Sequence, residues 1–284
     1  MADYAGFEAS VYYKQETTPG TTPAGQWKAL AQKVTVRVRD SPNPNFSPKS
    51  GSVDSAKPTK GVTEPVAIFT INPSLGSGKD FIKNFISTDN FFSLLLVKID
   101  TPSNFVFQRL VGCKVKRGNP SCTFGKIPQY ACEVWAFNIA YDEGTTPTYE
   151  AIPDTLLNWS DITIKTVADP GGTNPTRSNL TQWNSFDWTV ENELMRIYDK
   201  DGTTTNIKRG EREKTGTLEI VLTNTGQTEY DAAKNATPQD IEFLFSTDSY
   251  LFNDCAYTDV DTGHEEKSLS DKVLNFRAAT LTIT

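Results

Sequence analysis

The sequence predicts a mainly β fold of two tandem, duplicated β-barrel or sandwich domains, each with one flanking α-helix and a long hairpin loop. Stretches such as residues 33–40 alternate apolar and polar side chains with a period of two, which is typical of a sheet with one buried face. The order of elements in the first half returns in the second. The 284 residues suffice for two compact units of roughly 150 residues each. We therefore expect a first domain over residues 1–150, with an N-terminal arm, and a second over residues 151–284.

The first elements of each half follow one another in the same order. A short strand at residues 9–13 leads through a loop rich in Thr, Pro and Gly to Trp27 and the alternating strand at 33–40. In the second half, a strand at 162–167 leads through a similar loop to a tryptophan and a strand within residues 183–199. This shared order predicts that the chain contains one structural unit twice.

The middle of each half supports the repeat at the level of single residues. An offset of 151 aligns residues 67–92 with 218–243 without a gap. The identical pairs are Asp80 and Asp231, Lys83 and Lys234, Asn84 and Asn235, Asp89 and Asp240, and Phe92 and Phe243. Two repeats indicate paired domains, because a solenoid needs at least about three units.

One helix is expected in each half. In the first half, four apolar residues share one helical stripe after a start at Gly76–Asp80, namely Phe81, Ile82, Phe85 and Ile86. In the second half, residues 229–235 form a shorter candidate that Pro238 stops. Each half therefore combines a sheet with one packed helix.

Each half is then expected to close with two strands joined by a turn-rich connection. These strands are Leu110–Arg117 with Tyr130–Tyr141 in the first half, and Leu251–Val260 with Lys272–Thr282 in the second. The apolar run Phe91–Val97 predicts a further buried strand, since it is far shorter than the ~20 residues of a membrane span.

Composition and cysteine usage indicate a globular protein of a reducing compartment. Hydrophobic residues make up 37% of the chain, enough for a core, and charged residues 22%. The N-terminus lacks a basic region followed by an apolar stretch, so we expect a cytosol-like site of synthesis. The four cysteines lack metal-type spacing and are expected to be reduced core thiols, at positions 113, 122, 132 and 255.

Neither a catalytic site nor a cofactor or metal site is expected. The only histidine, His264, lies in a polar stretch without a nucleophile, and one histidine cannot form a histidine-rich metal site. Asp199–Gly202 resembles the start of a calcium loop but lacks the later ligands, so we expect a hairpin turn there. Gly76–Lys79 matches neither of the two glycine spacings of phosphate-binding loops, GxxxxGK[ST] and GxGxxG, so we expect it to start a helix. The 35 acidic residues leave open a hydrolase with paired carboxylates, although no spacing points to one.

Two long polar segments are harder to explain by packing. Residues 41–61 are rich in Pro, Ser and Lys, and residues 200–215 end in the charged cluster 208–214. Long loops inside compact domains are usually functional or disordered. Because the segments occupy matching places in the two halves, we interpret them as arms that become ordered against another subunit. Disordered hairpin tips are the alternative.

The chain also resembles a known protein family. Residues 15–27 look like the opening of tail tube proteins, the major tail proteins of long-tailed bacterial and archaeal viruses. Glu193–Asp199, Asp201–Gly202 and Ile207–Gly216 are similar to the strand, hairpin and strand of that family. The resemblance implies domains of two packed sheets with a flanking helix, six such domains per ring, and rings stacked into a hollow tube that conducts DNA. With two domains in this chain, three chains would complete a ring.

The resemblance also implies where the subunit makes contacts. In the family, the long hairpin loop contacts the neighbouring ring, which here falls on residues 41–64 and 200–215. The residues expected at this inter-ring interface are Asn45, Phe46, Lys57, Lys60, Lys208, Arg209, Glu211, Arg212 and Glu213. The implied partners are further copies of the chain and tail proteins such as the terminator, tape measure and baseplate components, with no membrane. The implied location is the virion tail, assembled in the host cytoplasm.

Charge bears on both assembly and ligands. The formal charge of −7 argues against a dedicated nucleic-acid binder, so DNA is expected as passing cargo. Residues 1–142 carry a net charge of +5 and residues 143–284 a net charge of −12. This asymmetry favours first-half to second-half contacts between chains, and such association should be sensitive to salt. The alternative function is a two-domain β-sandwich adhesin or carbohydrate-binding module, whose loops would form the recognition surface.

Overall fold

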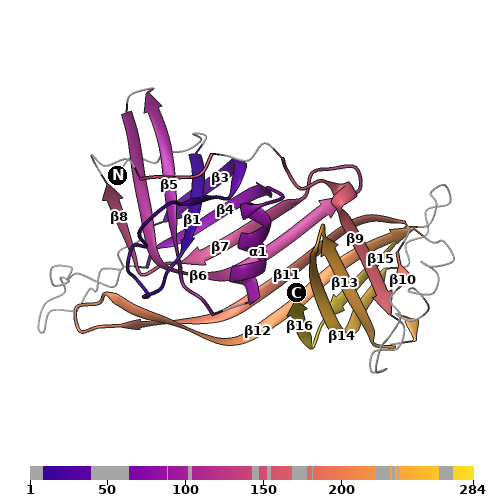
Figure 1. Cartoon of the computed structure of the whole chain (residues 1–284). Coiled ribbons are helices and arrows are strands. Elements are labelled where there is room, and N and C mark those ends of the chain that lie inside the picture. The colour runs from indigo at the N-terminus through magenta and orange to yellow at the C-terminus, as the bar shows by residue number, and fades with distance from the viewer. Residues whose placement is uncertain are drawn as a thin grey trace, which may run out of the picture.

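Antiparallel β-strands account for most of the described chain, as the period-two pattern predicts (Figure 1). The computed structural model describes residues 9–39, 64–87, 89–101, 104–142, 147–151, 155–167, 178–180, 182–221, 231, 234–235, 237–261 and 271–284. Within these ranges, 16 strands join into a single sheet that is accompanied by one α-helix, α1 (Ser77–Ser87). The predicted mainly β fold class is therefore confirmed.

The strands divide evenly between the two halves of the chain. The first half contains β1 (Ala9–Gln15), β2 (Lys28–Ala29), β3 (Ala31–Arg39), β4 (Val66–Pro73), β5 (Phe92–Thr101), β6 (Asn104–Thr123), β7 (Gln129–Trp135) and β8 (Asn138–Asp142). The second contains β9 (Ile162–Val167), β10 (Ser178–Asn179), β11 (Trp183–Tyr198), β12 (Thr204–Val221), β13 (Gln239–Phe245), β14 (Asp248–Asp261), β15 (Asp271–Arg277) and β16 (Thr280–Ile283). A short 3-10 helix, η1 (Trp159–Asp161), precedes β9.

The strand pairings of the first half return one for one in the second. In the first half β1 pairs with β2 and β5, β4 pairs with β3 and β7, and β6 pairs with β5, β7 and β8. In the second half β9 pairs with β10 and β13, β12 with β11 and β15, and β14 with β13, β15 and β16. The tandem duplication that the sequence predicts stays a proposal, and the equal pairing supports it.

The correspondence extends to single residues. One row across β3, β4, β7 and β6 consists of Arg39, Val66, Trp135 and Lys114. The equivalent row across β11, β12, β15 and β14 consists of Thr189, Thr215, Arg277 and Ala256. The backbone agrees, because Gly112 and Asp254, each two residues before the last member of its row, both have a positive φ, of 66° and 52°. Position 39 therefore corresponds to 189, and position 114 to 256.

The gapless offset of 151 residues predicted from the sequence is wrong. Phe92 lies opposite Cys113 and Gln239 lies opposite Cys255, so Phe92 corresponds to Gln239 rather than to Phe243. The tryptophans are not equivalent either, because Trp27 lies before β2 whereas Trp183 begins β11. The loops between equivalent strands differ in length, and a single offset therefore cannot hold along the chain.

The last predicted strand of each half is interrupted in the structure. Tyr130–Tyr141 divides into β7 and β8 at Ala136–Phe137, and Lys272–Thr282 divides into β15 and β16 at Ala278–Ala279. At the first break, the amides of Ala136 and Phe137 donate to Pro65 O (3.1 Å) and Val111 O (2.9 Å). The Phe137 ring packs directly over Gly112, so the chain changes direction around a buried aromatic side chain.

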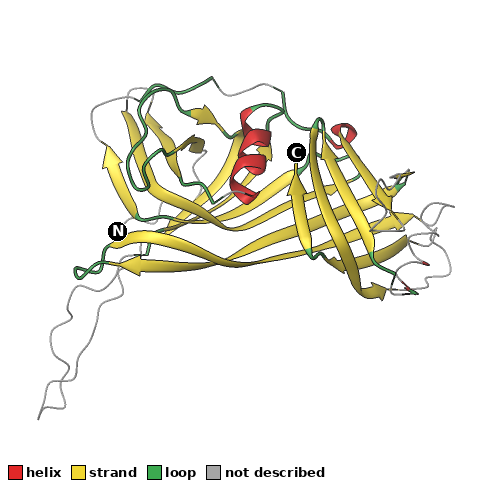
Figure 2. Cartoon of the chain, turned by 60° about the horizontal axis from the view of Figure 1, so that its bottom comes forward, coloured by secondary structure: helices red, strands yellow, loops and turns green. Residues whose placement is uncertain are grey.

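Helix α1 confirms the first helix prediction and lies between the two halves (Figure 2). Its apolar stripe, including Phe81, Ile82 and Phe85, is buried. On its other side, Lys79 Nζ lies 3.2 Å from Asp248 Oδ2 at the start of β14, so the helix ties the halves together. The second helix candidate, residues 229–235, lies largely outside the described residues. The arm at 41–61 lies wholly outside them.

One cluster of buried residues runs through both halves. Tyr13, Phe81 and Phe92 pack together at one end of this cluster. At the other end, Trp188 lies amid a group of rings that comprises Phe243, Phe245, Tyr250 and Phe252. The domain boundary between residues 150 and 151 stays a prediction.

The paired backbone positions generate a matched test of stability. We expect Gly112→Ala to lower the free energy of unfolding by more than about 2 kcal/mol, because a positive φ strains alanine and the new Cβ would collide with Phe137. Asp254→Gly should change it by less than about 0.5 kcal/mol or stabilise the protein, because the hydrogen bond to Asp240 uses the Asp254 main-chain amide. Urea unfolding of both variants checks this, and equal losses would contradict the account.

Candidate assembly interface

The two halves of the chain are joined edge to edge by β6 and β11. The end of β6 pairs antiparallel with the start of β11, with Thr123 opposite Ser185 and Arg117 opposite Glu191. Strand β5 pairs with the first part of β6, and β11 pairs with the same edge of β6 further along. Strand β7 pairs with the opposite edge of β6. We call this pairing the β6–β11 junction. It makes one continuous sheet from two repeated units.

Asn119 fixes the register at the centre of the junction. Its Nδ2 atom donates to Asp187 Oδ1 (2.8 Å), to the Trp188 carbonyl (3.0 Å) and to Thr189 Oγ1 (2.9 Å) on the facing strand. Because side chains on a strand alternate between faces, a slip of one residue would break all these contacts. The side chains at positions 119 and 189 therefore lie directly across from each other.

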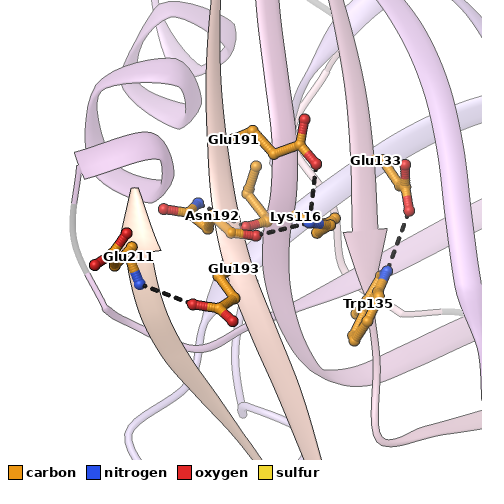
Figure 3. Close-up of polar contacts among 8 residues, drawn as sticks. Lys116, Glu133, Trp135, Glu191, Asn192, Glu193 and Glu211 are labelled. Atoms are coloured by element: carbon orange, nitrogen blue, oxygen red, sulfur yellow. Dashed lines mark hydrogen bonds and ion pairs between the residues drawn. The ribbon is translucent and has the colours of Figure 1, made fainter. Parts of the chain in front are cut away.

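A polar network continues past the end of the junction (Figure 3). Lys116 Nζ lies 2.9 Å from Glu191 Oε1 and donates to the Asn192 carbonyl at 3.0 Å. Asn192 is buried, and its Nδ2 donates to the Val115 carbonyl at 2.8 Å. Its Oδ1 accepts a hydrogen bond of 3.0 Å from Arg212 Nε, which carries the network to β12. A buried amide with partners on both strands resists slippage more strongly than apolar contacts do.

The β11–β12 hairpin extends from the junction along the first half (Figure 1). Leu194 and Ile207 form a buried cluster with Phe137. Arg196 donates to the Ala136 carbonyl (2.5 Å) and the Pro65 carbonyl (2.8 Å). Its guanidinium also lies 4.8 Å from the centre of the Trp135 ring. Burial lowers the pKa of Arg196, but the group keeps its charge because both carbonyls accept from it.

Most of the segment predicted as a second arm is a strand. Residues 204–221 form β12, paired along β11, and only 199–203 form a loop. Both faces of a long two-stranded ribbon can remain in contact with water, so both can carry charged residues. The sequence of such a ribbon therefore lacks the alternation of apolar and polar residues that predicts a strand. The hairpin turn predicted at Asp199–Gly202 is confirmed, with Asp199 Oδ1 accepting from the amides of Asp201 and Thr203, both at 2.9 Å. Within the described ranges, no group of acidic, His or Cys side chains is arranged to hold a metal ion.

The predicted inter-ring residues divide into three groups. Asn45, Phe46, Lys57 and Lys60 lie outside the described residues, as does His264. Arg209, Arg212 and Glu213 have partners in the same chain, namely Asp89 (3.8 Å), Asn192 (3.0 Å) and Arg277 (3.6 Å). Burial, followed by the nearby charge of Arg209, lowers the pKa of Arg212 to about 10. Lys208 and Glu211 have exposed side chains on β12. These last two remain the described candidates for contacts with another ring.

Sequence reasoning missed the residues that make the junction. Asn192 and Arg196 lie on the buried face of β11, which also carries Trp188, Val190 and Leu194. Polar residues at inward positions need specific partners, and that signal could have identified both. Asn119 leaves no such mark, because its partners lie about 70 positions away along the chain.

Among the described strands, the counterparts of the two edges that meet in the junction have no partner. Strand β3, the counterpart of β11, pairs only with β4 among the strands that the structure describes. Strand β14, the counterpart of β6, pairs with β13 up to Cys255 and then continues to Asp261 with β15 on its other side. In the described ranges no strand covers this last part of β14 where β11 covers β6. Open edges of this kind recruit further strands.

Comparison with known proteins identifies the family. A model of the family described as phage tail tube protein matches residues 6–265. The chain belongs to the phage tail tube protein family. It is a structural subunit of a viral tail tube, and it is located in the virion tail.

Solved structures and curated sequences add little to the assignment of this tail tube protein. Chains of a gene transfer agent virion and of an empty gene transfer agent tail are 12% and 13% identical, with TM-scores of 0.35 and 0.37. Both cover 45% of this chain and 98% of their own length. A chain of an anti-feeding prophage baseplate is 11% identical, with a TM-score of 0.29, over 50% of this chain and 97% of its own. No curated protein sequence matches. The described residues include no helix with the length and apolarity to cross a membrane.

Arg196 should stabilise the tail tube subunit strongly. We expect Arg196→Ala to lower the free energy of unfolding by about 2–4 kcal/mol, because two buried carbonyls lose a charged donor. Arg196→Lys should lose part of this, since an ammonium cannot reproduce the planar fork. The neighbouring Met195 is 61% exposed, and Met195→Ala should cost less than about 0.5 kcal/mol. Urea titrations that show no difference between Arg196→Ala and Met195→Ala would contradict this role.

Cys122, which lies opposite Phe186 in the junction, should make stability depend on alkaline pH. Burial raises the pKa of its thiol to about 11, whereas an unfolded thiol titrates near about 8.5. Since the folded state holds its proton to higher pH, stability is lost as pH rises through this window. The other three buried thiols, whose pKa values are also raised, act in the same direction. We expect a shallower loss between pH 8.5 and 11 for Cys122→Ala than for the wild type, and equal slopes in thermal unfolding would contradict it.

Proposed function

We propose that three copies of this subunit close into a ring of six similar units, and that such rings stack into a hollow tube that conducts DNA. The observation that carries the proposal is the β6–β11 junction, which joins two units with the same strand pairing and leaves an edge of β3 and an edge of β14 without a partner among the described strands. A junction that repeats with a constant rotation generates a closed ring or a helix. Membership in the tail tube family favours the closed ring.

The same symmetry supports the two-domain organisation. We propose that residues 1–150 and 151–284 arose by duplication of one unit, since every described pairing of the first half has a counterpart in the second. The opposite net charges of the two halves suit a ring in which unlike units alternate. Contacts between two first halves are penalised by repulsion, so the alternating order is favoured during association.

Contacts between rings are assigned to the arm at residues 41–64 and to the β11–β12 hairpin. The arm contributes the candidates Asn45, Phe46, Lys57 and Lys60, and the hairpin contributes its turn at 199–203 with the exposed Lys208 and Glu211. Arg209, Arg212 and Glu213 serve this contact less directly, because each already has a partner within the subunit. The arms would act as extensions that bind the next ring.

The role is structural rather than enzymatic, and no cofactor is required. DNA passes through the tube as cargo, and a net charge of −7 avoids the tight phosphate binding that would impede it. Further copies of the chain are the main partners. Terminator, tape measure and baseplate components are the further partners, and assembly takes place in the host cytoplasm.

Assembly of the purified protein tests this function directly. We expect concentrated wild-type protein to sediment as trimers or larger particles, and negative-stain microscopy to show rings or tubes with a central hole. Particles should form without nucleic acid, because the sheet edges supply the contacts. A protein that remains monomeric at all concentrations and binds glycans would contradict the proposal and favour the adhesin.

Removal of the arm separates ring formation from stacking. Deleting residues 43–60 should leave trimers or rings while tubes become short or absent, because the proposal assigns the arm to contacts between rings and the sheet edges to contacts within a ring. A deletion variant that makes tubes of wild-type length would contradict the role of the arm. The Met195→Ala variant, which alters one exposed hairpin side chain, serves as a folded control.

A further inference from the structure

We propose that Tyr130, Trp188 and Tyr250 bind one ordered water molecule inside the subunit, where the two halves of the chain meet. Tyr130 belongs to β7 of the first half, whereas Trp188 and Tyr250 belong to β11 and β14 of the second. The site is independent of the proposed ring, because all three residues lie within one chain. It gives a ligand to three buried polar groups that the hydrogen bonding of the protein leaves unused.

Each of the three residues is fully buried and carries a polar atom without a partner. Tyr130, Trp188 and Tyr250 are all 0% exposed. Within the described part of the chain, no hydrogen-bond partner reaches the two tyrosine hydroxyls or the indole Nε1 of Trp188. Buried polar groups nearly always have a partner in the protein or in ordered water, because the loss of hydration is otherwise uncompensated. Three such groups in one region therefore point to a bound ligand.

Strand pairing brings Tyr130 and Trp188 to the same place on the sheet. Tyr130 of β7 lies opposite Pro120 of β6. On the other edge of β6, Ser121 lies opposite Asp187. The antiparallel register therefore places Trp188 opposite Pro120. Since directly opposed residues share one face of a sheet, Tyr130 and Trp188 flank the compact side chain of Pro120 on the buried face.

Tyr250 completes the group. The centres of the Tyr250 and Trp188 rings lie 5.5 Å apart. Burial, followed by the neighbouring Cys132 thiol and Tyr250 phenol, raises the pKa of Tyr130 well above its ordinary value, so the two phenols are close enough to interact. The Cys132 thiol does not satisfy the Tyr130 hydroxyl, because thiols hydrogen-bond weakly and this one does not reach hydrogen-bond geometry.

The three groups match the hydrogen-bonding capacity of a water molecule. The two hydroxyls and the indole N–H supply three donors, and the phenolic oxygens also accept. A buried water makes about three hydrogen bonds, so it can accept two and donate one at this site. After burial, the carboxylates of Asp248 and Asp80 raise the pKa of Tyr250. The potential at this hydroxyl is therefore negative, which disfavours a halide ion as the ligand.

The water would reinforce the β6–β11 junction from its buried side. Pro120 has no amide hydrogen, so the main chain of β6 offers no donor at this point. Its neighbour Asn119 donates to the Trp188 carbonyl at 3.0 Å and to Thr189 Oγ1 at 2.9 Å, which holds the junction on the opposite face. A water shared by Tyr130 and the second half would link the same strands from within.

Removal of single hydroxyls tests the site, because the sign of the effect depends on whether a water is bound. If a water bridges the hydroxyls, Tyr130→Phe and Tyr250→Phe should each lower the equilibrium constant for folding about three- to tenfold. If the hydroxyls have no partner, each substitution removes an uncompensated buried group and should raise the constant. Urea unfolding measures both variants, and two neutral or stabilising substitutions would overturn the proposal.

The double variant tests whether the two hydroxyls share one ligand. Tyr130→Phe combined with Tyr250→Phe should cost less than the sum of the single effects, because the first substitution already weakens the water. The matched control is Tyr198→Phe, which removes a hydroxyl that donates to the Glu64 carboxylate on the hairpin. Its effect should add to that of Tyr250→Phe. Additive effects of Tyr130→Phe and Tyr250→Phe would overturn the shared site.

The salt used in these titrations distinguishes water from a halide ion. The difference in stability between the wild type and Tyr250→Phe should be the same in chloride and in sulfate at equal ionic strength. A ligand that binds only the folded state stabilises it in proportion to its own concentration. A larger difference in chloride than in sulfate would therefore assign the site to an anion and overturn the water.

A high-resolution crystal structure of the subunit provides the direct observation. One density peak should lie at hydrogen-bond distance, roughly 2.7–3.0 Å, from at least two of the three polar atoms. Side chains in direct contact, without such a peak between them, would overturn the proposal. None of these measurements requires ring formation, so they test the water site whether or not the proposed ring is correct.

Discussion

Main-chain pairing between β6 and β11 is the constraint on which the rest of the subunit depends. It converts two units, each with its own strand pairing, into one sheet, and it aligns the β11–β12 hairpin along the first half. Asn119 and Asn192 hold its register through hydrogen bonds to the facing strand. A polar side chain that is satisfied at only one register specifies that register more sharply than an apolar contact, because every alternative leaves it without a partner.

The hairpin shows how the junction is reinforced at a distance. Arg196 reaches two carbonyls of the first half and covers Trp135, so the ribbon cannot lift away without exposing a buried charged group and its acceptors. Helix α1 adds an ion pair between Lys79 and Asp248. The two halves are thus fixed relative to each other before any further copy binds. Such preorganisation lowers the entropic cost of closing a ring.

Local patterns predicted the elements but not their registration. The period of two in Val34–Val38 and the helical stripe of Phe81 predicted a strand and a helix that the structure contains. The offset between the repeats was wrong because loop lengths differ between them. The charges of residues 204–215 suggested an arm, whereas the family resemblance had assigned a strand to Ile207–Gly216, and the structure contains that strand. The contact between Asn119 and Thr189 leaves no local signal, since these residues meet only through the tertiary fold. The inter-ring role of the arm remains a prediction from family resemblance.

The central proposal is that three subunits, each with two similar units, close into one ring of the tail tube. Helical reconstruction of assembled tubes by electron cryomicroscopy tests it most directly, because the strands at each boundary can be traced. The account predicts six similar units around each ring, contributed by three subunits whose first and second halves alternate. A tube with another number of subunits in each ring, or one in which first halves contact first halves, would contradict it.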